Sequence, residues 1–336
     1  MRITAAFPTG VTALLFDEAE TRRRFEDAAV GMLRGRGFSE VILPILDYFE
    51  PYEALLTEQA REELYRFVDR DGELLALRGD FTPMLARVLA PRVASLELPL
   101  RLFYRGDRVR YQEERPGRLR EYYEMGAELL GAPGGAADEE MLELFLRVVQ
   151  LRDGVKVRVV LGFAGALDRL LVGCAAEGRA GLLRAIARRD RRAAREAGAA
   201  LLRVVEDGAP AAASDLGDEA APRLERLRAL VERVERRFDR DRVSLSIDLA
   251  EFAEDTLDPG LAAASGTPPY YDGFVFRAYA DGMALSAGRG GRYDRLFRRL
   301  GADLSAVGFS VSPDRLLRST ERAPSAAPNS TSRRAW

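Results

Sequence analysis

The sequence predicts an α+β protein, in which an antiparallel sheet is flanked by helices and carries a helical insertion. Residues 243–249, VSLSIDL, alternate apolar and polar side chains as a half-buried strand does. Residues 103–131 show a longer alternation on both sides of a Glu-Arg-Pro-Gly turn, which is typical of an antiparallel hairpin. Helical spacing of apolar residues at 17–37 and 138–150 predicts one helix before these strands and one between them.

Composition excludes several classes of chemistry. The chain has 336 residues, a formal charge of −2 and 31% charged residues, so it can bury a large core and has an ordinary charge balance. No stretch is basic enough to bind nucleic acid by charge alone. Histidine is absent and Cys174 is the single cysteine, which excludes a histidine-dependent triad, a histidine or cysteine zinc site and an internal disulfide. We expect no metal and no cofactor, and we interpret Cys174 as a small packed hydrophobe.

No targeting signal is expected from the sequence. The first residues, MRITAAFPTGVTALLF, lack a basic start followed by a long apolar run, so no secretory signal is expected. No stretch of about eighteen uncharged apolar residues exists that would span a bilayer. A cytoplasmic protein without membrane contact is therefore expected.

The N-terminal elements begin with the helix at 17–37, for which Asp17 or Thr21 is the expected cap. A buried strand, SEVILPIL, is predicted to follow at residues 39–46. Pro44 cannot donate to a strand ladder, so it belongs at a sheet edge, a bend or an interface.

A short hairpin and a capped helix come next. Residues 64–78 predict two strands joined by a turn at Asp71 and Gly72. In the segment RGDFTPMLAR, Asp80 or Thr82 could cap a helix that has proline in its first turn.

The predicted hairpin at 103–131 has one apolar and one charged face. On its second strand one face carries Leu119, Tyr123, Met125, Ala127 and Leu129. The other face carries Arg118, Arg120, Tyr122, Glu124 and Glu128, and Arg108, Arg110 and Gln112 share one face of the first strand. Such charges can simply be solvated or paired with one another. They can also form the floor of a pocket for a small ligand with acidic and basic groups, which the flanking pattern favours.

The C-terminal half predicts a helical insertion, at about residues 164–238, followed by further strands. The sequence predicts two or more helices within residues 164–207, a flexible connection at 208–222 and another helix at 222–238. The glycine-rich run 288–294, GRGGRYD, is not a phosphate-binding motif and predicts a tight turn that opens a helix ending at Gly301. The remaining predictions are strands at 157–161, 273–279 and 306–312, a short helix at 313–317, and a disordered tail at 319–336.

In this order, the segments resemble the catalytic core of class II aminoacyl-tRNA synthetases, in its histidyl branch. GFSEVILPIL resembles the first motif, which forms a dimer interface around a proline, here Pro44. VRYQEERPGRLREYYEMGAELLG resembles the second motif, with Arg110 as its arginine and Glu113 or Glu114 as its acidic residue. GRGGRYDRLFRRLG with AVGFSVSPDRLL resembles the glycine-rich element and third motif, with Arg315 as the motif arginine. PPYYDGFVFRAY resembles the histidine-recognition element.

The resemblance covers about residues 8–318, which would form one core, and the departures from it bear on function. In histidyl synthetases an arginine that assists adenylate formation lies four residues before the tyrosine pair, where this chain has Gly266. Asp80 replaces a glutamate of the family, and Glu124 replaces a glutamine of its amino-acid pocket. Only eighteen residues follow Arg318, so no anticodon-binding domain is expected and tRNA binding is not expected.

The segments RGDFTP, YRGD, GRLREYY and GAELLG are more similar to a paralogous family, the regulatory subunits of ATP phosphoribosyltransferase. That resemblance implies a non-catalytic subunit that binds histidine and activates or feedback-regulates a short catalytic subunit in the first step of histidine biosynthesis. A self-dimer through the first motif is implied as well. The alternatives are a truncated histidine–tRNA ligase, or another ligase-like core that forms an aminoacyl adenylate.

By motif position, the resemblance assigns histidine binding to Asp80, Thr82, Arg110, Arg118, Glu124, Glu128, Tyr270 and Tyr271. In this hypothesis Asp80, Glu124 and Thr82 hold the α-ammonium group, and Arg110 or Arg118 holds the α-carboxylate. Glu128 and one of the two tyrosines bond the imidazole nitrogens. Glu113, Glu114 and Arg315 would be the remnant of a nucleotide site.

Overall fold

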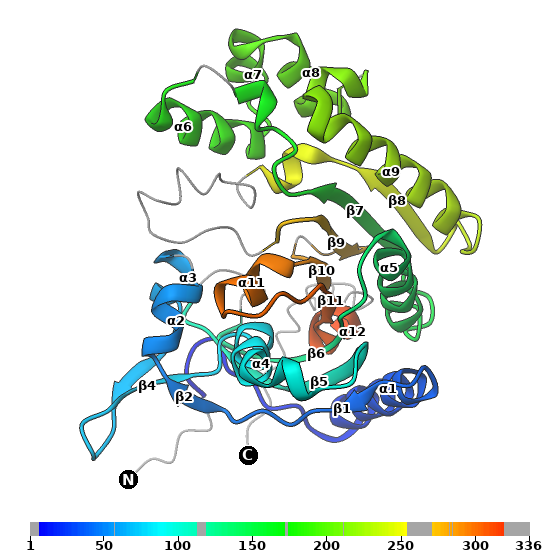
Figure 1. The fold of residues 1–336 in the computed structure, drawn as a ribbon. Coiled ribbons are helices and arrows are strands. Elements are labelled where there is room, and N and C mark those ends of the chain that lie inside the picture. The colour runs from blue at the N-terminus through cyan, green and yellow to red at the C-terminus, as the bar shows by residue number, and fades with distance from the viewer. Residues whose placement is uncertain are drawn as a thin grey trace, which may run out of the picture.

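A sheet of eight strands, in the order β1-β5-β6-β11-β10-β9-β7-β8, runs through the molecule (Figure 1). This computed structural model describes residues 7–56, 58–112, 119–171, 174–210, 212–253, 271–281, 283 and 285–318. The strands in sheet order are β1 (Ser39–Glu40), β5 (Leu100–Val109), β6 (Glu121–Leu130), β11 (Ala306–Val311), β10 (Gly288–Arg292), β9 (Phe274–Ala280), β7 (Val157–Phe163) and β8 (Val243–Ile247). All neighbours pair antiparallel except the two outermost pairs, β1–β5 and β7–β8, which are parallel. The predicted antiparallel α+β sheet is confirmed.

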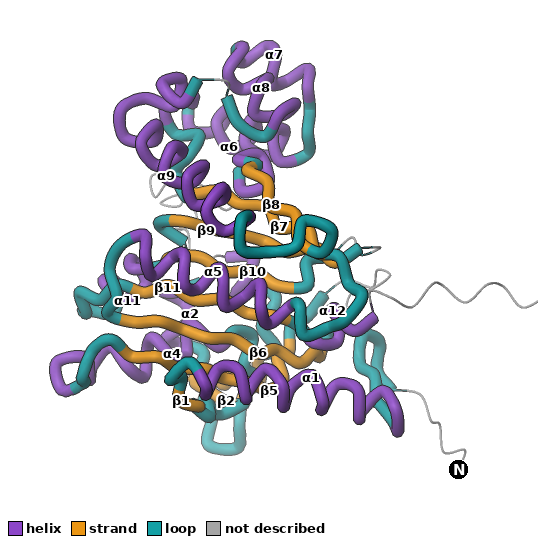
Figure 2. Tube along the Cα trace, turned by 90° about the vertical axis from the view of Figure 1, so that its right-hand side faces the viewer, coloured by secondary structure: helices purple, strands orange, loops and turns teal. Residues whose placement is uncertain are grey.

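Helices cover both faces of this sheet (Figure 2). The main hydrophobic core lies on one face, under α1 (Phe16–Gly35), α5 (Gly135–Val149) and α9 (Gly217–Glu235). A smaller core on the other face is formed by α4 (Phe81–Leu89) and α11 (Asp294–Arg299). The helix at 17–37 is therefore confirmed as α1, although neither Asp17 nor Thr21 caps it, because its N-cap position is Leu15 without a side-chain hydrogen bond.

The hairpin β5–β6 has the two faces that its sequence alternation predicts. Met125, Ala127 and Leu129 are buried in the main core. Glu124 and Glu128 point to the opposite face, because alternate strand residues point to opposite sides. The predicted turn residues 113–118 lie outside the described part of the chain.

The predicted strand at 39–46 is wrong as one element, because the chain bends at Ile45, directly after Pro44, and enters a second sheet. β1 ends at Glu40, and β2 (Leu46–Tyr48) joins β4 (Leu74–Leu77) and β3 (Arg66–Val68) in the order β2-β4-β3. At the bend, Arg78 Nη1 donates to the carbonyl oxygens of Leu43 at 2.6 Å and Pro44 at 3.0 Å. The hairpin turned at Asp71 and Gly72 is confirmed as β3–β4, and α2 (Glu50–Leu55) and α3 (Glu58–Glu62) lie beside it.

The glycine-rich run at 288–294 is a central strand, β10, so the predicted turn is wrong. The rings of adjacent elements occupy the space that side chains would need. A Cβ atom on Gly290 would lie 2.4 Å from Phe276 Cζ, and one on Gly288 would lie 2.6 Å from Phe145 Cε2. Packing against these rings stabilises a strand that intrinsic propensity does not indicate.

The helical segment consists of α6 (Ala176–Ala187), α7 (Arg191–Ala197) and α8 (Ala199–Asp207), which lie at the top of Figure 1 beyond β7 and β8. The predicted connection at 208–222 is wrong in its second half, because α9 begins at Gly217 and contains Pro222. Buried Ala220 and two acidic residues in the first turn favour this earlier start.

Two further sequence predictions can be compared with the structure at this point, and a third lies outside it. Cys174 is exposed just before α6, so its interpretation as a packed residue is wrong. The predicted short helix at 313–317 is confirmed as α12 (Pro313–Arg318). The tail at 319–336 lies outside the described residues.

Candidate functional site

The first turn of α4 presents a carboxylate to a group of arginines. Asp80 caps the helix, its Oδ1 accepting from the backbone N–H of Thr82 at 3.2 Å. Its Oδ2 lies 3.2 Å from Nη2 of both Arg110 and Arg289, and 3.9 Å from Nη2 of Arg108. Burial opposes ionisation, but Arg108, Arg289 and Arg110 together hold the pKa of Asp80 below its ordinary value. Asp80 therefore stays ionised, and its ion pairs link the start of α4 to β5 and β10.

A second buried carboxylate pairs with the same group of cations. Arg108 Nη1 donates to Glu124 Oε2, and the two residues are only 3% and 4% exposed. Burial alone would lower the pKa of Arg108, but Glu124, Tyr122 and Asp80 together outweigh burial and hold the pKa of the guanidinium above its ordinary value. Glu124 Oε1 is buried and accepts no hydrogen bond from the described residues. Buried oxygens normally have a donor, so this atom marks a position where a ligand donor would be favourable.

Glu128 lies two strand positions beyond Gly126 on the same face and has a different environment. Its Oε1 accepts from Thr82 Oγ1 at 2.9 Å and its Oε2 from the Tyr293 hydroxyl at 2.5 Å. Burial raises the pKa of Glu128 to about 8 despite these two bonds. No arginine or lysine of the described residues forms an ion pair with it, in contrast to Asp80 and Glu124.

Aromatic residues and glycines set the shape of this site. Tyr104 stacks on Phe81 with ring centroids 4.3 Å apart and packs against Gly126, where an added Cβ would lie 2.4 Å from the phenol. Gly308 on β11 pairs with Glu128, and a Cβ there would lie 1.5 Å from Glu128 Oε2. Any larger residue at position 308 would have to displace the carboxylate.

The structure brings together Asp80, Thr82, Arg110, Glu124 and Glu128, five residues that the sequence assigned to histidine binding. Tyr271 lies at the same sheet face beside β10, since a Cβ on Gly291 would come within 2.9 Å of its ring. The remaining predicted residues, Arg118, Tyr270, Glu113 and Glu114, lie outside the described part of the chain.

The two predicted arginines that the structure describes have defined partners. Arg110 donates from Nε to the Gly79 carbonyl at 2.7 Å and reaches Glu63 and Asp80 through its other nitrogens. Arg315 donates to the Ser286 carbonyl at 3.0 Å, and its guanidinium lies 5.2 Å from the centre of the Tyr122 ring. Arg108 lies 5.0 Å from that ring centre, so Arg315 belongs to the same cluster.

Sequence reasoning did not assign site roles to Arg108, Arg289 or Tyr293. Arg108 could have been found, because it shares a strand face with Arg110 and the opposing strand carries Glu124. Arg289 and Tyr293 lie in or directly after β10, whose sequence predicted a turn with no assigned face. Their roles were missed because the sequence predicted a turn where the structure has a strand.

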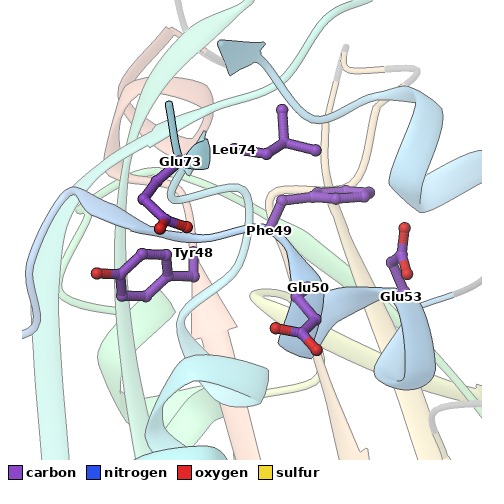
Figure 3. Close-up of a pocket in the computed structure, with 6 residues that line it drawn as sticks. All are labelled: Tyr48, Phe49, Glu50, Glu53, Glu73 and Leu74. Atoms are coloured by element: carbon purple, nitrogen blue, oxygen red, sulfur yellow. The ribbon is translucent and has the colours of Figure 1, made fainter. Parts of the chain in front are cut away.

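A separate pocket lies beside the small sheet, away from this cluster. It has a volume of about 240 Å³ and is lined by Tyr48, Phe49, Glu50, Glu53, Glu73 and Leu74 (Figure 3). None of the predicted site residues lines it. Among the described residues, no cluster of His, Cys, Asp and Glu could hold a metal ion. Within the same ranges, every helix is too short or too polar to cross a bilayer.

Comparison with known proteins identifies the family. Residues 10–316 match the histidyl-tRNA synthetase family. The ATP phosphoribosyltransferase regulatory subunit of Symbiobacterium thermophilum is 35% identical, over 94% of this chain and 80% of the relative. The ATP phosphoribosyltransferase regulatory subunit of Anaeromyxobacter dehalogenans is 33% identical, over 95% of this chain and 92% of the relative.

Solved structures share the fold. A Bacillus halodurans protein described as an ATP phosphoribosyltransferase regulatory subunit/histidyl-tRNA synthetase aligns with a TM-score of 0.77 and 23% identity, over 96% of this chain and 85% of that one. An ATP phosphoribosyltransferase complex from Thermotoga maritima contains a chain that aligns with a TM-score of 0.63 and 18% identity, over 87% of this chain and 97% of that one. The chain therefore belongs to the histidyl-tRNA synthetase-like family and, within it, to the ATP phosphoribosyltransferase regulatory subunits.

Proposed function

We propose that this chain binds free histidine on the charged face of β5, β6 and β10 and transmits its presence to a short catalytic ATP phosphoribosyltransferase. The names of the relatives support the regulatory role. The observation that carries the ligand assignment is the cluster of buried charges of both signs around Asp80, Glu124 and Glu128. A small zwitterion with a polar ring matches such a cluster.

The amino-acid end of the ligand would lie between Asp80, Glu124 and Arg289. The buried Glu124 Oε1, which accepts no hydrogen bond from the described residues, can accept from an α-ammonium group. The Arg289 side chain is 39% exposed and carries one of the cations that can reach an α-carboxylate. All three Arg110 nitrogens have partners, so Arg289 is the better carboxylate ligand of the two.

The ring end would lie against Glu128. Its carboxylate is fixed by Thr82 and Tyr293, and a ring N–H can donate to it as a third partner. A ligand without such a donor would leave Glu128 buried and poorly satisfied, which is how polar sites reject close analogues. The proposed site therefore selects an imidazole over an apolar ring.

We further propose that the chain has no ligase activity of its own. Gly266 stands where the synthetases have the arginine that assists adenylate formation. A cation aimed at the developing charge of a transition state is commonly worth a hundredfold or more in rate, on the order of 10² to 10³. Arg315, with Glu113 and Glu114, is then a remnant of a nucleotide site.

A second copy of the chain is the proposed occupant of a partly exposed apolar face on the small sheet. Register pairs place five apolar side chains on this face, namely Leu46, Tyr48, Phe67, Leu75 and Leu77. Tyr48, Leu46 and Phe67 are 55%, 44% and 41% exposed. Since β2 continues directly from the first-motif segment, pairing of two copies at this face agrees with a dimer through that segment.

Two measurements on the purified chain test the proposal. Isothermal titration calorimetry should show saturable binding of histidine, and size-exclusion chromatography should show co-elution with a short catalytic subunit. Histidine-dependent ATP–pyrophosphate exchange should be at background. Robust exchange would support a ligase instead, and a preference for another amino acid would remove the histidine assignment.

A further inference from the structure

The ammonium end of the proposed site already contains the protein's own cations. Arg108 Nη1 donates to Glu124, and Arg108 Nη2 lies 3.9 Å from Asp80. Arg110 and Arg289 each lie 3.2 Å from the same Asp80 oxygen. Three guanidinium groups therefore face two carboxylates at the place where the ligand's ammonium group would enter.

The ring end differs, because its carboxylate has no such cation among the described residues. Among the described residues, Glu128 accepts hydrogen bonds only from the hydroxyl groups of Thr82 and Tyr293. A ligand donor gains its full interaction with Glu128, since no internal charge competes for it. One end of the site thus contains several of the protein's own cations, and the other end contains none among the described residues.

We propose that Arg108 is a specificity-determining residue that acts as an internal cation and weakens recognition of the ligand's α-ammonium group. This inference rests on the proposed histidine site. Selection then depends mainly on the ring and the carboxylate of the ligand. The site accepts imidazole carboxylic acids as a class, with or without an α-amino group.

The charge balance explains this weakening. An ammonium group that approaches Glu124 meets a carboxylate whose other oxygen is bonded to Arg108, and it also meets the repulsion of Arg108 and Arg289. Without Arg108, Asp80 would still face Arg110 and Arg289, whereas Glu124 would lose its hydrogen-bonded cation and be left for the ligand. A hydrogen bond to a free charged group corresponds to a factor of about 10 to 100 in affinity.

The test compares two ligands in wild type and Arg108→Gln. The ligands are histidine and 3-(imidazol-4-yl)propionate, which is histidine without its α-amino group, and calorimetry gives the ratio of their dissociation constants. In wild type, histidine should bind less than about tenfold more tightly. In Arg108→Gln this preference should rise by a further factor of about 10 to 100.

A double-mutant cycle separates this effect from loss of structure. Arg108→Gln combined with Glu124→Gln is an uncharged pair of similar size and should return the ratio to near the wild-type value. Arg101→Gln, on the opposite face of the same strand and paired with Glu140, is the control and should leave the ratio unchanged.

Each outcome bears on one of the two proposals. If neither ligand binds to wild type, the histidine site is wrong. If both bind and Arg108→Gln leaves their ratio unchanged, Arg108 is only structural and the inference is overturned. A wild-type preference for histidine above about tenfold also overturns the inference. This measurement needs no variant, so the inference can be refuted even if Arg108→Gln does not fold.

Discussion

Replacement of Glu128 by glutamine should remove a pH dependence from the stability of the ligand-free protein. Glu128 is 1% exposed, is bonded by two hydroxyl groups and has no cationic partner among the described residues. Glutamine keeps the size of the side chain and can still accept a hydrogen bond, but it cannot ionise. The variant therefore isolates the cost of burying the charge.

The size of the effect follows from the pKa of Glu128, which burial raises from the ordinary 4.5 to about 8. A shift of this size corresponds to roughly 5 kcal/mol between the two protonation states, as an upper bound. Because the pKa is higher in the folded state than in the unfolded state, the stability from protonated Glu128 is fully present below pH 4.5 and is lost as the pH rises to about 8. The slope is about 1.4 kcal/mol per pH unit within that window.

Urea unfolding at a series of pH values from 5 to 9 measures this effect. The free energy of unfolding of wild type should fall relative to that of Glu128→Gln by about 1.4 kcal/mol per unit up to pH 8, and then level off. Glu121→Gln, an exposed position on the same strand, is the control and should run parallel to wild type. Parallel curves for Glu128→Gln would refute the argument that this carboxyl is buried without charge compensation.

Three further predictions concern shape, charge and assembly. Gly308→Ala should weaken histidine binding at least about tenfold and destabilise the fold by about 1 to 3 kcal/mol, because the added Cβ would lie 1.5 Å from Glu128 Oε2. Gly31→Ala, which has open space around it, is the control. Unchanged histidine binding by Gly308→Ala in calorimetry would contradict the proposed pocket. Asp80→Asn keeps a helix cap but removes the charge that faces three arginines, so urea unfolding should show a loss of about 3 kcal/mol, and a loss below about 0.5 kcal/mol would contradict the ion cluster. Phe67→Glu should convert the proposed dimer to a folded monomer in light scattering, and an unchanged dimer would show that the apolar sheet face is not the interface.

The hairpin β5–β6 could be predicted in detail because a period of two assigns each side chain to a face. That alternation placed Glu124 and Glu128 on the charged face and Met125 in the core, as the structure confirms. The helical spacing of apolar residues likewise predicted α1 and α5. Where the period is long and the residues are distinctive, local pattern determines the element.

The errors arose where tertiary contacts override local preference. β10 is a strand because the rings of Phe145 and Phe276 fill the space beside its glycines, which no local pattern can show. At Pro44, the missing N–H signalled a break, but the guanidinium that satisfies the carbonyls at the bend comes from Arg78. The cations of the site were missed similarly, because Arg289 meets Asp80 only after the sheet has formed.

The central claim is that histidine bound at Glu128 controls the catalytic subunit, and inhibition of the reconstituted complex tests it most directly. Allosteric coupling of this kind is typically about 1 to 3 kcal/mol, a change of roughly 5- to 150-fold in affinity. Formation of phosphoribosyl-ATP should be inhibited by histidine with wild-type regulatory subunit. With Glu128→Ala, inhibition should be lost while the complex still assembles. Unchanged inhibition of an intact Glu128→Ala complex would contradict the account.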